Sequence, residues 1–537
     1  MPRFRKAALI SAIALPVVAG GFLLQSHSAR EGPALLDQVM QLVSQRFVDT
    51  LPVSDVYEKA ADGLVTQLND PYSELFSPRD YKQFNSRTGG RYGGLGMLIE
   101  QDPQTKVMRV VTVYPNTPAE NGGVREGDLI VKVDTLSTRG WTINQVSDSL
   151  TGDPGTKVHA TFARPGVPAP IEETFTRAII NIPAVPYTIT LGNKIGYMPL
   201  LQFNENTADN VGAALKKLEA EGARGLIIDM RGDPGGILTQ SLEVASMFIK
   251  PGQLIASVKG REGPDDVENA KGTPIAPSLP LIILVDDRTA SAAEIVTGAL
   301  QDHDRALVVG QTSYGKGLVQ TVYTLDGGYA LKLTTGKWFT PSGRSIQRPR
   351  KFVNGQFVEV APDTNENNTT KKSRPAYKSD AGRVVYGGGG ITPDVIVQDD
   401  TLTTTEQTFT KAIAPKAQDF FTVLTDYSMA LAKSAPANFT VQPAWTNEFY
   451  NRLQAKGVIS DRKVYDAGSR YVNRLLEQRI AHFAAGDSAA KRRDLPYDAP
   501  LRKAIDLLDK GGSQRELFTV AGEALDSARP STPPKKP

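Results

Sequence analysis

The stretch "PLIILVDDRTASAAEIVTGALQDH" (residues 280–303) joins an apolar run to a segment with helical spacing through a turn of small residues. Continuous short apolar runs are typical of strands that are buried on both faces. The same alternation comes twice before it, with strand-like runs at 195–201 and 225–230 and helix-like segments at 207–222 and 238–249. It predicts a largely parallel sheet covered by helices over residues 184–400, with functional loops at the carboxyl ends of the strands.

The remaining patterns predict a multidomain α/β protein around this core. Helical spacing over residues 30–88 predicts a small helical region, and short β-like runs between Gly and Pro turns predict a mostly β module over 89–183. Residues 348–389 are polar and predict a long surface loop inserted in the core. Residues 401–528 have helical spacing, and residues 529–537 have the composition of a disordered tail.

Residues 1–29 have the features of an export segment. Basic residues precede an apolar stretch from Ala7 to Leu24 in which only Ser11 is polar. This pattern predicts either a signal peptide, cleaved before Ala29, or a membrane anchor whose length is near the lower limit for a spanning helix. We therefore expect an exported protein, either periplasmic or anchored in the inner membrane and facing the periplasm.

Composition excludes several classes of function. The 61 Lys and Arg residues nearly balance the 58 Asp and Glu residues, so no basic field is available to attract nucleic acid. There is no cysteine, which excludes disulfides, thiolate metal sites and a cysteine nucleophile.

Two interpretations of Ser291 are open on the sequence alone. Ser291 and Glu294 match a capping box, in which the serine side chain and the glutamate satisfy the first amides of a helix. A helix N-terminus also supplies N–H groups and a positive dipole end, which stabilise an oxyanion when a base activates the serine. The isolated pattern favours the cap.

The base that Ser291 would need is a tractable question. Of the four histidines, only His303 lies in the predicted core, and twelve helical residues place it about 18 Å from Ser291, too far for contact. Lysine serves as a base when burial favours its neutral form. Lys316 stands between two glycines after an apolar run, with Gln320 four residues on, although such a lysine is usually a solvated turn residue.

Residues 310–316 also match a phosphate-binding loop at all but its last position. Gly317 lacks the hydroxyl that would hold magnesium, and the residues after it alternate like a strand where a phosphate loop begins a helix. A nucleotide hydrolase is therefore a distant alternative.

Five motifs occur together and in order: "DMRGDPGG", "DRTASAAEI", "GQTSYGKGLVQ", "TPSGRSIQ" and "GGITPDV". With them, residues 35–397 resemble the carboxyl-terminal processing proteases, also called tail-specific proteases, which are serine peptidases with a serine–lysine mechanism. The resemblance implies a core related to the crotonase and Clp-peptidase folds, with no metal, nucleotide or organic cofactor. In this family the last two motifs are almost adjacent, whereas here residues 348–389 separate them.

The resemblance also implies roles for individual residues. Ser291 corresponds to the nucleophile, Lys316 to the general base, and Gln320 to the residue that orients the lysine. The amides of Ala292, Gly235 and Gly236 correspond to the oxyanion hole.

Residues 89–183 resemble a PDZ domain. Gly93, Gly94, Leu95 and Gly96 correspond to the loop that holds a terminal carboxylate, ahead of a strand that pairs with a peptide. Arg164 corresponds to a basic residue that couples PDZ position to activity, and a solvated surface arginine is the alternative.

The sequence therefore predicts an exported serine endopeptidase that binds the apolar carboxyl-terminal tails of proteins through a PDZ domain. Assembly into an oligomer and use of an adaptor protein stay open. The main alternative is a non-catalytic PDZ scaffold, which has no need for serine, lysine, glutamine and diglycine together.

Overall fold

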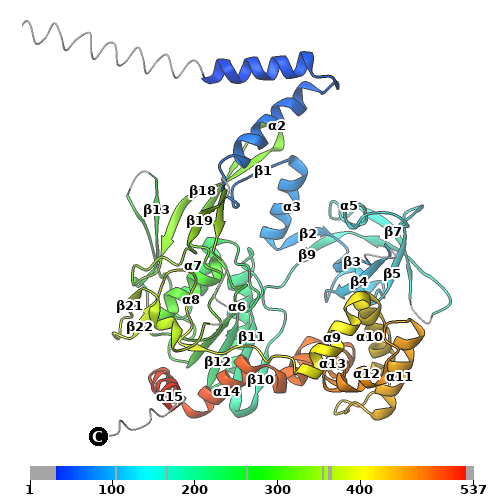
Figure 1. The fold of residues 1–537 in the computed structure, drawn as a ribbon, viewed down its shortest axis with the longest axis vertical. Coiled ribbons are helices and arrows are strands. Elements are labelled where there is room, and N and C mark those ends of the chain that lie inside the picture. Colours follow the sequence, from blue (N-terminus) through cyan, green and yellow to red (C-terminus); the bar gives the residue numbers. More distant parts are fainter. Residues whose placement is uncertain are drawn as a thin grey trace, which may run out of the picture. The chain divides into compact units, whose positions relative to one another are not determined.

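The computed structural model describes residues 32–102, 106–164, 167–261, 264–353, 356–360 and 366–527. The predicted export segment and the tail at 529–537 lie outside these residues. Within the described part of the chain, no helix combines the length and apolarity needed to cross a membrane. The chain separates into two units, whose elements are labelled in Figure 1: residues up to 81 with 320–334 and 352–357, and residues 82–319, 335–351 and 358–537.

The first unit contains the helices predicted at the start of the chain. Residues 32–46 are helical and α2 spans Val53–Thr66. Strand β1 (Glu74–Phe76) pairs antiparallel with the first residues of β18 (Ala330–Phe339). Helix α3 (Pro78–Gly89) then continues into the second unit.

The centre of the second unit is a six-stranded sheet with the order β10-β11-β12-β15-β16-β23. Its strands are β10 (Ile189–Leu191), β11 (Ile195–Pro199), β12 (Gly225–Asp229), β15 (Leu281–Val285), β16 (Leu307–Gly310) and β23 (Val395–Ile396). Neighbours from β11 to β23 are parallel, and β10 adds one antiparallel edge. The predicted parallel sheet is confirmed.

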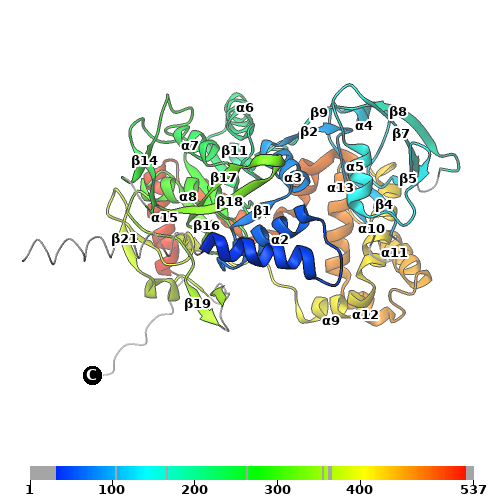
Figure 2. The same ribbon diagram turned by 90° about the horizontal axis from the view of Figure 1, so that it is seen from above.

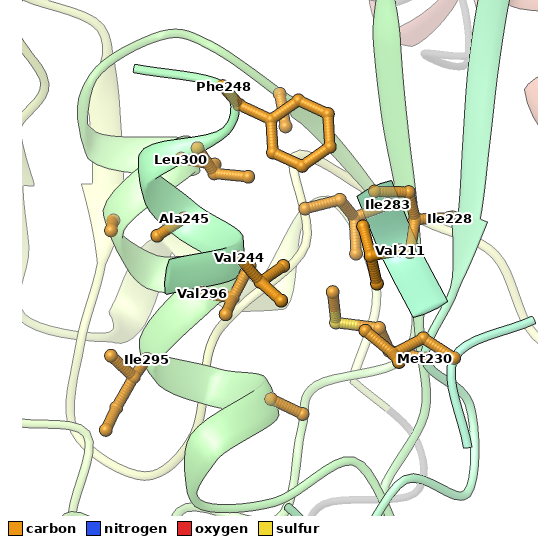
Figure 3. Packing of buried hydrophobic residues seen from close by; sticks show 14 of the residues in the cluster. Val211, Ile228, Met230, Val244, Ala245, Phe248, Ile283, Ile295, Val296 and Leu300 are labelled. Atoms are coloured by element: carbon orange, nitrogen blue, oxygen red, sulfur yellow. The ribbon is translucent and has the colours of Figure 1, made fainter. Parts of the chain in front are cut away.

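One face of this sheet is covered by α6 (Thr207–Ala220), α7 (Leu238–Ser246) and α8 (Ala292–Asp302), which are neighbours in Figure 2. Strand alternation directs Leu226 and Ile228 into this layer, because successive side chains point to opposite faces. Figure 3 shows Val244 and Phe248 directed toward Ile228 and Ile283 of the sheet. Each such side chain contributes about 1.5–3 kcal/mol by leaving water.

The opposite face is covered by α14 (Ala499–Lys510) and α15 (Gln514–Ser527). Leu507 and Leu517 are fully buried in the same cluster as Ile227 of the sheet. The sequence assigned these helices to a C-terminal region separate from the core, whereas the structure places them in it. The physical reason is that a sheet with apolar side chains on both faces needs cover on both.

The mostly β module is a sheet with the order β3-β4-β5-β7-β8, to which β6 is attached. Its elements are β3 (Met97–Gln101), β4 (Met108–Val113), β5 (Leu129–Val133), β6 (Leu136–Ser137), β7 (Lys157–Ala163), β8 (Ile171–Thr176), α4 (Pro118–Asn121) and α5 (Ile143–Leu150). Strands β2 (Arg91–Gly94) and β9 (Ala178–Asn181) pair at its two chain ends. Val110, Ala160 and Phe162 are fully buried at its centre.

The described residues of the insertion at 348–389 contain regular structure, which corrects the predicted surface loop. It contains the pairs β19 (Arg350–Val353) with β20 (Gln356–Glu359) and β21 (Ala376–Lys378) with β22 (Val384–Tyr386), and the 3-10 turn Thr370–Ser373. Its polar side chains have partners in the core: Lys371 is buried and donates to the carbonyl of Pro393 at 3.0 Å. The polarity of the insertion therefore reflects buried hydrogen bonds at residues such as Lys371 as well as exposure at others.

A further sheet lies before the insertion. Strand β13 (Leu254–Gly260) pairs with β14 (Asp266–Asn269) and with the last residues of β18, and β17 (Leu318–Thr324) also pairs with β18.

The predicted C-terminal helices are present as a bundle with an aromatic core. They are α9 (Thr404–Ile413), α10 (Ala417–Ala432), α11 (Pro443–Ala455), α12 (Arg462–Ala467) and α13 (Ser469–Asp494). Phe409, Phe420 and Phe449 are fully buried there. The bundle also contacts the β module, since Arg109 pairs with Asp426 at 3.2 Å and His482 with Glu126 at 2.6 Å.

Candidate active site

Three loops of the predicted site leave the same edge of the central sheet. The diglycine turn follows β12, Ser291 follows β15, and Lys316 follows β16. These strands are parallel neighbours, so their carboxyl ends meet at one edge.

Ser291 has an unusual backbone conformation. Its φ is 55° and its ψ is −116°, a region that non-glycine residues rarely adopt and that costs on the order of 1–3 kcal/mol. Ser291 is the N-cap of α8 and forms the predicted capping box with Glu294, and the N–H of Glu294 also donates to the Ser291 carbonyl oxygen at 2.9 Å. Backbone strain at a non-glycine N-cap is typical of functional sites, so it favours a chemical role for Ser291 beside its capping role.

Glu294 joins the serine turn to the lysine loop. Its Oε2 accepts the backbone N–H of Ser291 at 2.8 Å and that of Lys316 at 2.9 Å. Its Oε1 accepts the N–H of Gly315 at 2.7 Å and the hydroxyl of Ser313 at 2.5 Å. One carboxylate therefore fixes the main chain at both predicted reactive residues.

The Glu294 carboxylate is fully buried, and its surroundings act on its pKa in two directions. Burial raises the pKa of Glu294 above its ordinary value, and the four hydrogen bonds oppose that rise. The ionised form, which only accepts hydrogen bonds, suits four donors. Sequence reasoning identified Glu294 only as a capping partner, because its contacts with residues 313–316 depend on the tertiary fold.

The main chain at Lys316 is held on both sides. Its N–H is bound by Glu294, and its carbonyl accepts the indole N–H of Trp338 at 3.0 Å. Next to it, the N–H of Gly317 donates to Gln347 Oε1 at 2.9 Å. The strand β17, rather than a helix, follows this loop, so a phosphate-binding loop lacks its second element.

The diglycine turn packs directly against Ser291. Gly235 has a φ of +87°, and a Cβ there would lie 2.6 Å from Ala290 O, 2.7 Å from Ala292 N and 2.8 Å from Ser291 Cβ. A Cβ at Gly236 would lie 2.0 Å from Phe203 O. Only glycine fits at these two positions without displacing backbone.

The predicted oxyanion amides differ in their partners. The N–H of Gly235 donates to Asp233 Oδ1 at 2.7 Å, which commits it elsewhere. The backbone of Phe203 bonds to the carbonyl of Gly235 and to the N–H of Ile237, the residues on either side of Gly236. Because backbone groups of successive extended residues point in alternate directions, the Gly236 N–H points away from Phe203. Ala292 is the first residue of α8, so its N–H has no acceptor within the helix.

Asp233 is a buried residue of this site that sequence reasoning missed. Its carbonyl accepts the N–H of Ala290 at 2.9 Å and so ties the diglycine turn to the serine turn. Burial raises the pKa of its carboxyl well above the ordinary value, and Oδ2 has no hydrogen-bond partner among the described residues. Both features suit a protonated acid.

Gln320 belongs to the first unit, and Ser291 and Lys316 belong to the second. Its amide donates to Thr334 Oγ1 at 3.5 Å, and Thr334 Oγ1 donates to Asp70 at 2.5 Å. Its predicted role in orienting Lys316 stays a prediction.

His303 is occupied by structural contacts. Its ring nitrogens lie 2.7 Å from Asp380 Oδ2 and 2.7 Å from the carbonyl of Leu254. This agrees with its exclusion as the base. Among the residues that the structure describes, no group of three or more His, Asp or Glu side chains is arranged to hold a metal ion.

The predicted carboxylate-binding loop precedes an edge strand. Strand β3 ends its sheet, so one side of its backbone is open to pairing. Leu95 is buried and anchors the loop, and Gly96 has a φ of +88° with Thr117 where a Cβ would be. Gly93 and Gly94 pair with β9 instead, which fixes the start of the loop.

Arg164 is bound within the β module. Its guanidinium donates to both carboxylate oxygens of Asp128, at 2.7 and 2.8 Å, and to the carbonyl of Gly123 at 2.7 Å. The alternative of a solvated surface arginine is therefore wrong, and the predicted coupling to activity stays a prediction.

Comparison with known proteins places these residues in a family context. The sequence profile of peptidase family S41 matches residues 194–365, and that of the PDZ domain matches residues 109–164. A carboxy-terminal-processing protease of Bartonella bacilliformis is 36% identical over 319 residues, which cover 58% of this chain and 72% of the relative. The carboxy-terminal processing protease CtpA of Bacillus subtilis is 31% identical over 360 residues, covering 66% and 76%. A solved photosystem II D1 C-terminal processing protease is 29% identical with a TM-score of 0.35, covering 60% and 84%.

Proposed function

The chain belongs to the carboxy-terminal processing proteases of peptidase family S41, and on that premise we propose an exported endopeptidase that uses Ser291 as nucleophile and Lys316 as general base. Membership makes the chain a serine peptidase with a PDZ domain, which removes the non-catalytic scaffold and the nucleotide hydrolase as functions. The proposal adds the mechanism, the substrate tail and the compartment.

The observation that carries the mechanism is the shared carboxylate of Glu294. Because one oxygen binds the N–H of Ser291 and the N–H of Lys316, the two residues are positioned from a single buried point. A nucleophile and its base must be held within hydrogen-bond reach, and such pre-organisation supplies a large share of catalysis.

The reaction proceeds in two stages. Neutral Lys316 accepts the proton of Ser291 Oγ as that oxygen bonds to the scissile carbonyl carbon, and the N–H groups of Ala292 and Gly236 bind the oxyanion. The carbon–nitrogen bond then breaks, the lysine gives its proton to the leaving amine, and an acyl-enzyme is left. Water attacks the acyl-enzyme with Lys316 again as base, which releases the acid and restores the serine.

The open edge of β3 supports recognition of protein tails. An extended peptide adds to such an edge through main-chain hydrogen bonds, and amides of the loop at 94–96 hold its terminal carboxylate. Leu98 on β3 is 50% exposed, so an apolar tail gains contact there. Export is supported by the basic start and apolar stretch of residues 1–29.

Substitution of Lys316 tests the mechanism. The purified full-length chain in detergent is given a loosely folded protein with an apolar tail. We expect Lys316→Ala and Lys316→Arg both to lose cleavage by at least about 100-fold, because arginine keeps the charge but cannot deprotonate. Lys337→Ala, an exposed lysine on β18, is the matched control and should cleave like wild type. Cleavage by Lys316→Arg at the wild-type rate would exclude lysine as the base.

A further inference from the structure

The insertion at residues 348–389 contacts the loop that carries Lys316. Residues 311–317 form neither helix nor strand, so their position depends on tertiary contacts. Glu294 holds this loop from α8, and the insertion holds it from another element. The insertion is therefore a second support of the same loop.

Two carboxylates of the insertion make these contacts. Thr312 Oγ1 donates to Glu366 Oε2 at 2.5 Å, and the Tyr314 hydroxyl donates to Glu359 Oε2 at 3.0 Å. The start of the insertion adds the N–H of Arg348, which donates to the Gly315 carbonyl at 2.9 Å, and the Arg348 guanidinium lies 4.6 Å from the Tyr314 ring centre. Contacts thus fall on three of the four residues before Lys316, namely Thr312, Tyr314 and Gly315.

Glu366 is itself fixed within the insertion. It is 6% exposed and paired with Arg374, whose second nitrogen donates to it at 3.1 Å. Arg374 also donates to the carbonyl of Gly389 at 3.1 Å. A Cβ on Gly315 would lie 3.2 Å from the C atom of Gly389, which ends the insertion, and 2.8 Å from the N atom of Gly390, so this glycine turn packs on the lysine loop as well.

We propose that the insertion positions Lys316 for catalysis, with Glu366 and Thr312 as positioning residues. The inference rests on the proposed function, since it takes Lys316 to be the base. Catalytic geometry requires placement to within about 0.5 Å, and a shift of about 1 Å costs on the order of 100-fold in rate. A loop without regular structure meets that requirement only through such side-chain contacts.

The test uses the full-length enzyme and paired substitutions at one hydrogen bond. Thr312→Val removes the hydroxyl at nearly constant volume, Thr312→Ser keeps it, and Glu366→Gln removes the charge that pairs with Arg374. We expect Thr312→Val and Glu366→Gln to lower kcat about 10-fold with KM changed less than about 2-fold, and Thr312→Ser to restore most of kcat. Glu219→Gln on an exposed position of α6 is the matched control.

The outcomes separate this inference from the proposed function. If Lys316→Ala is inactive while Thr312→Val and Glu366→Gln keep wild-type kcat, the positioning role fails and the mechanism stands. If Lys316→Ala cleaves at the wild-type rate, both fail. A loss of kcat that only follows the loss of folded protein, measured by thermal unfolding of each variant, would also overturn the inference, since it would show a purely structural contact.

Discussion

The two faces of the central sheet are covered by helices of different origin. On one face, α6, α7 and α8 alternate with the strands along the chain, and Ser291 is the N-cap of α8. On the other, α14 and α15 arrive from about two hundred residues later and bury Leu507 and Leu517. Both faces bury apolar side chains fully, so the two layers differ in the roles of the residues at the helix N-termini.

The comparison shows that helices on both faces bury the sheet, whereas only those on one face also position residues of the candidate active site. Ser291, the N-cap of α8, lies at the strand edge where the three site loops meet, whereas Asp498, the N-cap of α14, takes part in an ion-pair network. Asp498 binds Arg231 at 2.7 Å and Lys491 at 2.7 Å, and Arg231 also binds Asp229 at the end of β12. We therefore expect substitutions on the α8 face to change activity and those on the α14 face to change stability.

Gly235→Ala should have the largest effect of the set, and on activity. The added Cβ meets Ala290, Ser291 and Ala292 at under 3 Å, so the nucleophile or the oxyanion amides must move. We expect kcat to fall by at least about 100-fold, measured with a tailed protein substrate. Gly192→Ala, where nothing lies within 4 Å, should leave kcat unchanged. An active Gly235→Ala enzyme would break the assignment of chemistry to this face.

Asp498→Asn should reduce the free energy of unfolding by up to about 3–5 kcal/mol at pH 7, because it leaves the Lys491 charge without its carboxylate and Arg231 with Asp229 alone. Chemical denaturation gives this difference. Asp506→Asn is the control, since that carboxylate is 44% exposed and its pairs with lysines contribute less than about 1 kcal/mol.

The ion pairs of Asp498 with Arg231 and Lys491 also predict that the free energy of unfolding depends on pH. Burial raises the pKa of Asp498, but Arg231 and Lys491 outweigh it and hold the pKa well below 3.8, the unfolded value. A lowered folded pKa contributes stability above pH 3.8 that is lost as the pH falls through the folded pKa. The difference between wild type and Asp498→Asn should therefore shrink as the pH is lowered below about 4. A difference that stays constant to pH 2 would contradict the ion-pair account.

Leu507→Ala should have the smallest effect on catalysis. It creates a cavity on the α14 face and should reduce the free energy of unfolding by about 2–5 kcal/mol. The kcat of the folded protein should stay within about 2-fold of wild type, whereas Leu300→Ala on α8, with a similar loss of stability, should lower it further. Equal effects on kcat would show that the two faces are not functionally distinct.

Local pattern was sufficient for the parallel sheet and for the helices between its strands, because strand and helix periods are read from neighbouring residues. It was insufficient for α14 and α15, whose amphipathic spacing gives no information on which face they cover. It also read the polarity of residues 348–389 as exposure, although Lys371 and Glu366 are buried in hydrogen bonds.

The same distinction applies to the site. The motifs identified the turns that carry Ser291, Gly235 and Lys316, and the structure leaves their catalytic roles as proposals. Glu294 and Asp233 were missed as contacts because their partners lie on loops distant in sequence. The hydrogen bond from the Gly235 N–H to Asp233 could not be predicted from the sequence either, since it depends on the rotamer of the Asp233 side chain.

Glu294 has a consequence for how the site tolerates thermal motion. Because the main chain at Ser291 and at Lys316 hangs from one carboxylate oxygen, a displacement of α8 carries both residues in the same direction. We therefore expect the separation of these two main-chain N–H groups to change less than the position of either one. Glu294 therefore acts as a common anchor for the nucleophile turn and the lysine loop.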